Sequence, residues 1–140
     1  MLYRNGMKFT LQAPSSSNLV QACTEEEIIV RDHVIRGSVI LTAAEIVFDW
    51  PPTSIEDLIP HHLQAVLQLK PDVILLGTGK RQVFPDAEVL AAVRTAGVGL
   101  EVMDTRAACR TYNVLVQEGR SVAAALIVEC TADGLGGVGR

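Results

Sequence analysis

The segment Gly77-Thr78-Gly79-Lys80 has the residue types of a phosphate-binding loop. It follows the apolar run Val73–Leu76 and precedes a helical pattern, as such loops do between a strand and a helix. Backbone N–H groups and a lysine in a loop of this kind bind the phosphates of a nucleotide. A match would therefore indicate a nucleotide enzyme.

The segment fails both common loop types, in its letters and in its geometry. A P-loop needs Gly-x-x-x-x-Gly-Lys-[Ser/Thr], but Ile74 stands at the first glycine position and Arg81 at the hydroxyl position. A dinucleotide loop needs a third glycine, and that position holds Gln82. Val83-Phe84-Pro85 also delays the helix, because a residue before proline is pushed toward extended geometry. We therefore interpret the glycines as the exit from a buried strand.

A binding site without catalysis is still predicted at this end of the strand. The next expected strand ends in Asp104-Thr105-Arg106, and ligands of open α/β sheets bind where the carboxyl ends of parallel strands meet. The helix that follows has polar residues at helical spacing on one face, at Arg106, Arg110, Asn113 and Gln117. We expect a small anion or an acidic partner segment between Lys80, Thr105 and Arg110. The alternative is a solvated helix face beside a polar loop.

The candidate binding residues share this strand edge and the helix after it. They are Gly77, Thr78, Gly79, Lys80, Asp104, Thr105, Arg106, Arg110 and Asn113. Asp104 is best explained as a helix N-cap, with Thr105 sharing that task. Its alternative role, a general base, lacks an identifiable nucleophile.

The three cysteines, Cys23, Cys109 and Cys130, form no CxxC pair and no metal-binding spacing. Cys109 lies early in an expected helix between two arginines, which could lower its pKa and make it nucleophilic. It also shares a helix face with Tyr112 and Val116, which favours a buried structural thiol. No partner cysteine in the sequence supports redox chemistry.

The histidines indicate no metal site. His61 and His62 are adjacent, so on a helix they point about 100° apart and cannot chelate one metal together. His33 lies in a predicted turn. The sequence has no Gly-x-Ser-x-Gly motif and no Ser–His–Asp arrangement. We therefore predict no catalytic residue, no metal ligand and no cofactor, and we expect a protein that is not an enzyme.

The first 50 residues are rich in short β-forming runs, separated by turn formers such as Asp32 and Gly37. This pattern predicts hairpins or a meander. The expected strands are Met7–Leu11, Leu19–Cys23, Ile28–Val30, Val34–Ile35, Val39–Leu41 and Ile46–Phe48. Pro51 and Pro52 end this part, because proline interrupts a ladder. Phe48 and Trp50 are expected to wedge the two halves of the chain together, or else to form an exposed contact patch.

The second half alternates between helix and strand. Helices are predicted over residues 60–69, 86–96 and 106–118, and strands at Val73–Leu76, Val98–Met103 and Val122–Val128. Ser54 with Asp57 resembles a weak capping box before the first helix. Right-handed crossovers make the three strands a parallel sheet with helices on its faces.

The bulk composition bounds the class of protein. The chain has 140 residues, 49% of them apolar and 20% charged, and a net charge of −4. We predict a single domain over 1–140, with a β-rich half at about 1–50, an alternating half at about 53–130 and a flexible tail at 131–140. Acidic character argues against nucleic acid as a partner. Unpaired cysteines and the lack of a long apolar run indicate a cytoplasmic protein without a transmembrane segment.

Three segments carry a family resemblance over about residues 18–128: PDVILLGTG, VGLEVMDTRAACRTYNVL and EGRSVAAALI. They are similar to domain-of-unknown-function family 498, which includes a mitochondrial assembly factor of NADH dehydrogenase (complex I) and an adipogenesis-associated protein. The resemblance implies a three-layer α/β (α+β mixed) fold. In that fold a mixed, partly parallel central sheet has helices on one side and a β-plus-α layer on the other.

The family implies little about chemistry. Its GTG and DTxAAxRTYN motifs coincide here with the strand-edge residues reached above. Our first hypothesis is a non-enzymatic interaction or assembly domain with a protein partner, acting on respiratory complex I. The second is a domain that binds a small anion. Since no mitochondrial presequence is recognisable, we expect a bacterial cytoplasmic protein, and the oligomeric state stays open.

Overall fold

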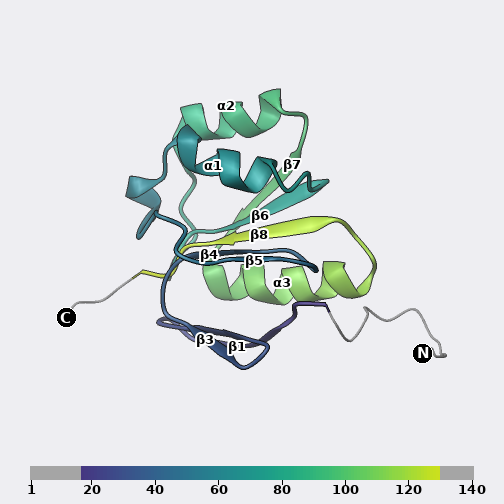
Figure 1. The fold of residues 1–140 in the computed structure, drawn as a ribbon. Coiled ribbons are helices and arrows are strands. Elements are labelled where there is room, and N and C mark those ends of the chain that lie inside the picture. The colour runs from purple at the N-terminus through teal and green to yellow at the C-terminus, as the bar shows by residue number, and fades with distance from the viewer. Residues whose placement is uncertain (1–16, 130–140) are drawn as a thin grey trace.

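The computed structural model describes residues 17–129 (Figure 1). Within this range the chain forms a three-stranded antiparallel sheet, a five-stranded mixed sheet and three α-helices. The predicted strand Met7–Leu11, Cys130 and the predicted tail 131–140 lie outside the described residues.

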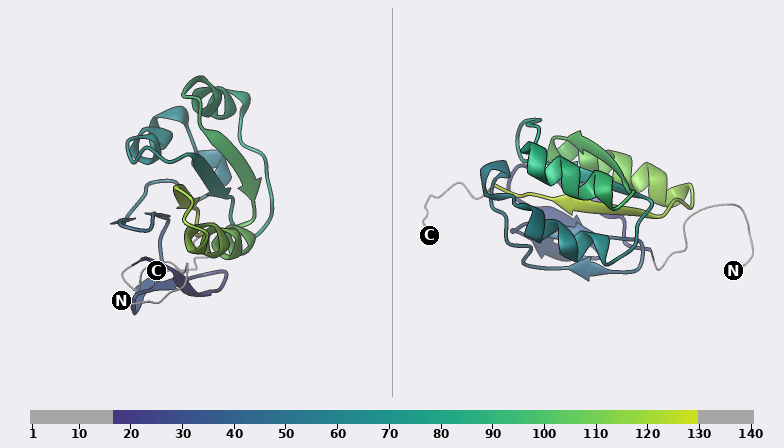
Figure 2. Two further views of the ribbon diagram at one scale, coloured as in Figure 1. Left: turned by 90° about the vertical axis from the view of Figure 1, so that its right-hand side faces the viewer. Right: turned by 90° about the horizontal axis from the view of Figure 1, so that it is seen from above.

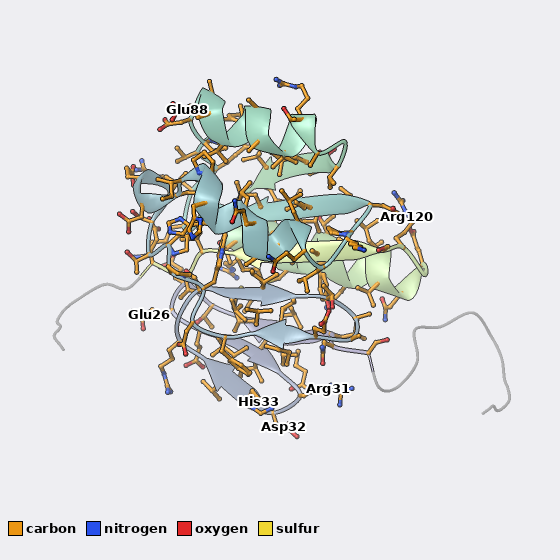
Figure 3. All side chains as sticks on the ribbon, turned by 45° about the horizontal axis from the view of Figure 1, so that its top comes forward. Glu26, Arg31, Asp32, His33, Glu88 and Arg120 are labelled. Atoms are coloured by element: carbon orange, nitrogen blue, oxygen red, sulfur yellow. The ribbon has the colours of Figure 1, made fainter. Side chains whose placement is uncertain are left out.

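The three-stranded sheet is a meander, as the alternation of β-rich runs and turn formers predicts. Its strands are β1 (Val20–Cys23), β2 (Ile28–Val30) and β3 (His33–Ile35). The β2–β3 turn consists of Arg31 (φ 52°) and Asp32 (φ 69°). Two left-handed residues suit the twist of a tight hairpin. Figure 3 shows the side chains of Arg31, Asp32 and His33 gathered at this turn.

The central sheet has the strand order β5-β4-β8-β6-β7. Its strands are β4 (Val39–Leu41), β5 (Ile46–Val47), β6 (Val73–Gly77), β7 (Gly99–Met103) and β8 (Val122–Leu126). Strand β6 is parallel to both β7 and β8, which confirms the predicted parallel sheet. Strand β4 is antiparallel to β8 and to β5. The β-rich part of the chain is therefore divided, because β4 and β5 extend the central sheet while β1–β3 form their own.

Three layers result from this division. Helices α1 (Pro60–Leu67) and α2 (Ala87–Thr95) cover one face of the central sheet. Helix α3 (Thr105–Gln117) covers the other face, and the β1–β3 meander lies beyond it and beside β4 and β5 (Figures 1 and 2). This arrangement confirms the predicted three-layer α/β fold with a mixed sheet.

The alternation of side chains along the central strands creates two separate cores. Leu75 of β6 belongs to the core shared with α3 and the meander, whereas Ile74 and Leu76 belong to the core under α1 and α2. All three are fully buried. Strands covered on both faces are expected to be apolar throughout, and this explains the uninterrupted run Val73–Leu76.

Trp50 and Phe48, the two aromatic residues at the junction of the halves, have different environments. Trp50 is 3% exposed and its indole N–H donates to the His62 carbonyl at 3.0 Å, so Trp50 is the predicted wedge. Phe48 is 48% exposed and packs edge-on against His33, so it is not part of that wedge.

The predicted capping box of Ser54 with Asp57 is not formed. Ser54 precedes a 3₁₀ helix without a side-chain cap bond, and the Asp57 carboxylate instead accepts from the Thr53 hydroxyl at 2.6 Å.

No helix within residues 17–129 combines the length and the apolar character needed to span a bilayer.

Candidate functional site

Three consecutive backbone amides of the glycine loop, those of Thr78, Gly79 and Lys80, are bound by the protein itself. Thr78 N–H donates to the Met103 carbonyl at 2.9 Å, and Gly79 N–H donates to the Thr105 hydroxyl at 2.9 Å. Lys80 N–H donates to the Glu129 carboxylate at 2.9 Å. Helix α2 begins only at Ala87, so its positive end is remote from the glycines. The loop therefore offers no free amides to a phosphate, which agrees with its failure as a P-loop.

Thr105 joins three segments of chain at this edge. Its side-chain hydroxyl accepts from Gly79 N–H and donates to the Ile127 carbonyl at 2.7 Å. The residue is only 5% exposed. Gly77 allows this approach, because a Cβ there would lie 2.9 Å from the Cα atom of Thr105. The glycine at the end of β6 thus permits α3 to start directly against the sheet.

Asp104 caps helix α3 as predicted, but the prediction that Thr105 shares the cap is wrong. Asp104 alone caps α3, since its carboxylate accepts from Ala107 N–H at 2.9 Å. The Thr105 hydroxyl is turned away to the glycine loop and to the segment after β8. The hydroxyl of a threonine at the first helical position is not needed for the cap. Here it satisfies buried backbone groups of the neighbouring segments instead.

A cavity of about 280 Å³ lies beside Thr105. Its lining combines six of the predicted residues with four others: Gly79, Lys80, Asp104, Thr105, Arg106 and Arg110, and Thr24, Glu25, Ile127 and Val128. Lys80 and Arg110 bring positive charge, while Glu25 lies 3.9 Å from the Lys80 ammonium. The site is thus a polar hollow of mixed charge with a cationic excess on the α3 side.

The other three predicted residues have structural contacts elsewhere. Gly77 packs under Thr105. The Thr78 hydroxyl is buried and accepts from Val83 N–H at 3.1 Å. The Asn113 amide pairs with both backbone groups of Val20, at 2.8 Å each.

Sequence reasoning did not find the residues that the meander adds to this region. Thr24 and Glu25 come from the β1–β2 turn and line the cavity opposite the start of α3. Glu129, which binds Lys80 N–H, follows β8. Only the packing of the meander on α3 places Thr24 and Glu25 here, and no spacing in the sequence indicates that packing.

A second cavity, of about 300 Å³, adjoins the first along α3. Its lining includes Cys23, Cys109, Arg106 and Arg110. Cys109 is 2% exposed, so the predicted burial is confirmed. Strand β1 brings a second free cysteine, Cys23, to the same cavity, which the sequence did not indicate.

The histidines do not converge with other ligands. Within residues 17–129, no group of three His, Cys, Asp or Glu side chains is placed to hold a metal ion. His62 Nδ1 accepts from Ile59 N–H at 3.2 Å, and His33 packs against Phe48.

The chain is similar to proteins from bacteria and from animals. Residues 20–127 match the family described as "Protein of unknown function (DUF498/DUF598)". The "13 kDa major membrane protein" of Francisella tularensis is 37% identical over 52% of this chain and 59% of its own length. The "NADH dehydrogenase [ubiquinone] 1 alpha subcomplex assembly factor 3" of Xenopus tropicalis is 36% identical over 71% of this chain and 55% of its own. The chain therefore spans little more than half the length of these relatives.

A solved structure gives the same fold. The NMR structure of a Xanthomonas campestris protein is 44% identical and has a TM-score of 0.73, covering 90% of this chain and 92% of that one.

Proposed function

Since this chain belongs to the DUF498/DUF598 family of proteins of unknown function, we propose that it is a non-enzymatic interaction domain that assists assembly of a respiratory NADH dehydrogenase. The observation that carries the proposal is the similarity to the assembly factor 3 relatives, which spans most of the folded region. The 44% identical structure is from a bacterium, and we place the proposed role in a bacterial protein.

An exposed apolar segment supports a protein partner. Phe84 is 66% exposed and Val83 is 37% exposed in the loop between β6 and α2. Val83 lines a hollow of about 360 Å³ together with Ile55 and with the charged residues Lys80, Arg81, Glu56 and Glu129. Aromatic residues are enriched at protein interfaces, and the rims of interfaces are polar. We therefore assign the partner contact to this loop.

The test is a deletion strain of the organism that encodes the chain, complemented with matched variants. Loss of the gene should lower the amount of assembled NADH dehydrogenase, measured by in-gel activity after native electrophoresis. The wild-type gene should restore it, and Phe84→Asp should not. Phe48→Asp is the control, because Phe48 is also half exposed but lies beside the meander. Normal enzyme levels in the deletion strain would contradict the assembly role.

A second candidate function is binding of a small anion in the 280 Å³ cavity. The observation that favours it is the presence of Lys80, Arg106 and Arg110 around one hollow. Binding would rely on these side chains, since the loop amides already have partners. Arginine suits carboxylate or phosphate because its planar fork donates two hydrogen bonds.

A thermal-shift series with inorganic phosphate and with citrate tests the anion site. An anion at 100 times its dissociation constant stabilises the fold by about 2.7 kcal/mol. Arg110→Ala should abolish the shift, and Arg94→Ala, an exposed arginine on α2, should leave it unchanged. A flat series for the wild-type protein would exclude this function.

A further inference from the structure

Two thiols far apart in the sequence share one cavity. Cys23 ends strand β1 and Cys109 lies in the second turn of α3. Both line the 300 Å³ cavity, and Cys23 packs against the buried cluster that contains Cys109. The two thiols are close enough for each to shift the pKa of the other.

The backbone around the pair is held in place by polar contacts. Asn113, one helical turn after Cys109, pairs with the N–H and the carbonyl of Val20 in β1. The Tyr112 hydroxyl donates to the Asn18 carbonyl at 2.5 Å, just before the same strand. These contacts hold strand β1 against helix α3, so Cys23 and Cys109 are kept on the lining of one cavity.

The two thiols differ in access and in acidity. Cys23 is partly exposed, and its pKa is lowered first by the hydrogen bond from the Cys109 thiol and also by the positive charge of Arg106. Cys109 is buried, and its pKa is raised by the hydrogen bond to Cys23 and by burial. A partly exposed thiol of lowered pKa beside a buried thiol is the arrangement of an attacking cysteine and a resolving cysteine.

We propose that Cys23 and Cys109 form a reversible thiol–disulfide pair, a modification site for low-molecular-weight disulfides such as glutathione disulfide. This inference goes beyond the assembly role, and it is independent of that role.

The reaction balances in two exchange steps. The Cys23 thiolate attacks one sulfur of glutathione disulfide, which forms a mixed disulfide and releases one glutathione thiolate. That thiolate takes the proton of the Cys109 thiol. The Cys109 sulfur then attacks Sγ of Cys23 and expels the second glutathione thiolate, which takes a proton from water. Counted from the two thiols, with the Cys23 proton released to water when its thiolate forms, the protein loses two electrons and two protons, and one glutathione disulfide becomes two glutathione molecules.

Arg106 and Arg110 link this pair to the neighbouring cavity, because both arginines line both cavities. Oxidation removes the Cys23 thiolate that Arg106 faces and ties β1 covalently to α3. The meander supplies Thr24 and Glu25 to the first cavity directly after Cys23. Disulfide formation would therefore fix the wall of the first cavity that the meander provides.

The experiment uses the full chain with Cys130→Ser, so that Cys23 and Cys109 are its two remaining thiols. The folded protein is incubated with glutathione disulfide, quenched with N-ethylmaleimide and measured by intact mass and peptide mapping. We expect a Cys23–Cys109 disulfide without bound glutathione or maleimide, and its reversal by dithiothreitol.

Two variants assign the roles of the cysteines. Cys109→Ala should stop at a single glutathione adduct on Cys23. Cys23→Ser should leave Cys109 unmodified or at least about tenfold slower to react, because a buried thiol supplies little thiolate. A stable glutathione adduct in the two-cysteine protein, or two unreacted thiols, would overturn the proposal. Disulfide formation that occurs only in denaturant would overturn it as well.

Discussion

At the residue scale, Thr105 illustrates how a position can be predicted while its partner cannot. The strand-then-helix pattern places Thr105 at the start of a helix, and a hydroxyl there is usually a cap candidate. Its actual partners are Gly79 N–H and the Ile127 carbonyl, which belong to two other segments. The choice depends on which buried groups lack a partner after folding, and that is a property of the tertiary structure.

Thr105→Val should destabilise the protein by roughly 2–4 kcal/mol, because it keeps the shape but leaves a buried N–H and a buried carbonyl unpaired. Urea unfolding measures the change. Thr105→Ser should recover a large part of the loss, since it restores the hydroxyl. Thr95→Val, at an exposed position of α2, is the control and should have little effect. Equal stability of Thr105→Val and the wild type would contradict the bridging role.

The lowered pKa of Cys23 predicts the pH dependence of its alkylation. Only the thiolate reacts, so a lowered pKa moves the rise of the iodoacetamide rate to a pH below that of a free cysteine, about 8.5. Arg106→Gln should move the rise back to higher pH, because one favourable charge is lost. Arg94→Gln should leave the profile unchanged. The rates are measured in the Cys130→Ser protein, and a rise at or above the free-thiol value would contradict the prediction.

At the scale of elements, the local patterns predicted most helices and strands but not how the strands divide. Four apolar residues in Val73–Leu76 predict a strand covered on both faces, and β6 has that environment. The short runs before Trp50 all resemble one another, and nothing local distinguishes β3 from β4. Strand β4 pairs with β8 across most of the chain, so its membership in the central sheet is decided by a long-range contact.

Gly77→Ala tests the contact between the end of β6 and the start of α3. The added Cβ would lie 2.9 Å from Thr105 Cα and Oγ1, so we expect a loss of about 1–3 kcal/mol from the forced displacement of backbone. Gly99→Ala is the control in the neighbouring parallel strand, since its Cβ would meet only ordinary contacts, the nearest at 3.5 Å. Chemical denaturation of both variants checks the difference. Similar losses in the two would show that the close approach is not the reason for a glycine at 77.

At the scale of the whole molecule, the meander is attached to the body through a small number of polar contacts and one apolar cluster. The family resemblance predicted the layers, because the three segments that carry it correspond to β6, to β7 with α3, and to β8. The candidate site could be predicted only on its α3 and β6 side. Its other wall is formed by the meander. The meander places Cys23 and Glu25 near Arg106 and Arg110 of α3, which are far from them in the sequence.

Asn113→Ala should loosen that attachment. It removes both hydrogen bonds to Val20, and we expect a loss of about 1–3 kcal/mol. Amide hydrogen exchange should accelerate over residues 20–35 and stay slow in β6 and β8, which are buried on both faces. Gln117→Ala, an exposed position farther along the same helix, is the control. Uniform acceleration across the central sheet would contradict a local attachment role.

Strand β8 has a further consequence for how much the molecule can tolerate change. Its middle consists of Ala123, Ala124 and Ala125, all fully buried, with Ala124 in the core toward α3 and its two neighbours in the core toward α1 and α2. Methyl groups thus act as the spacers between the outer layers. A larger side chain at any of the three would have to push a whole layer outward, so sequence drift in the centre of this protein is confined to the smallest residues.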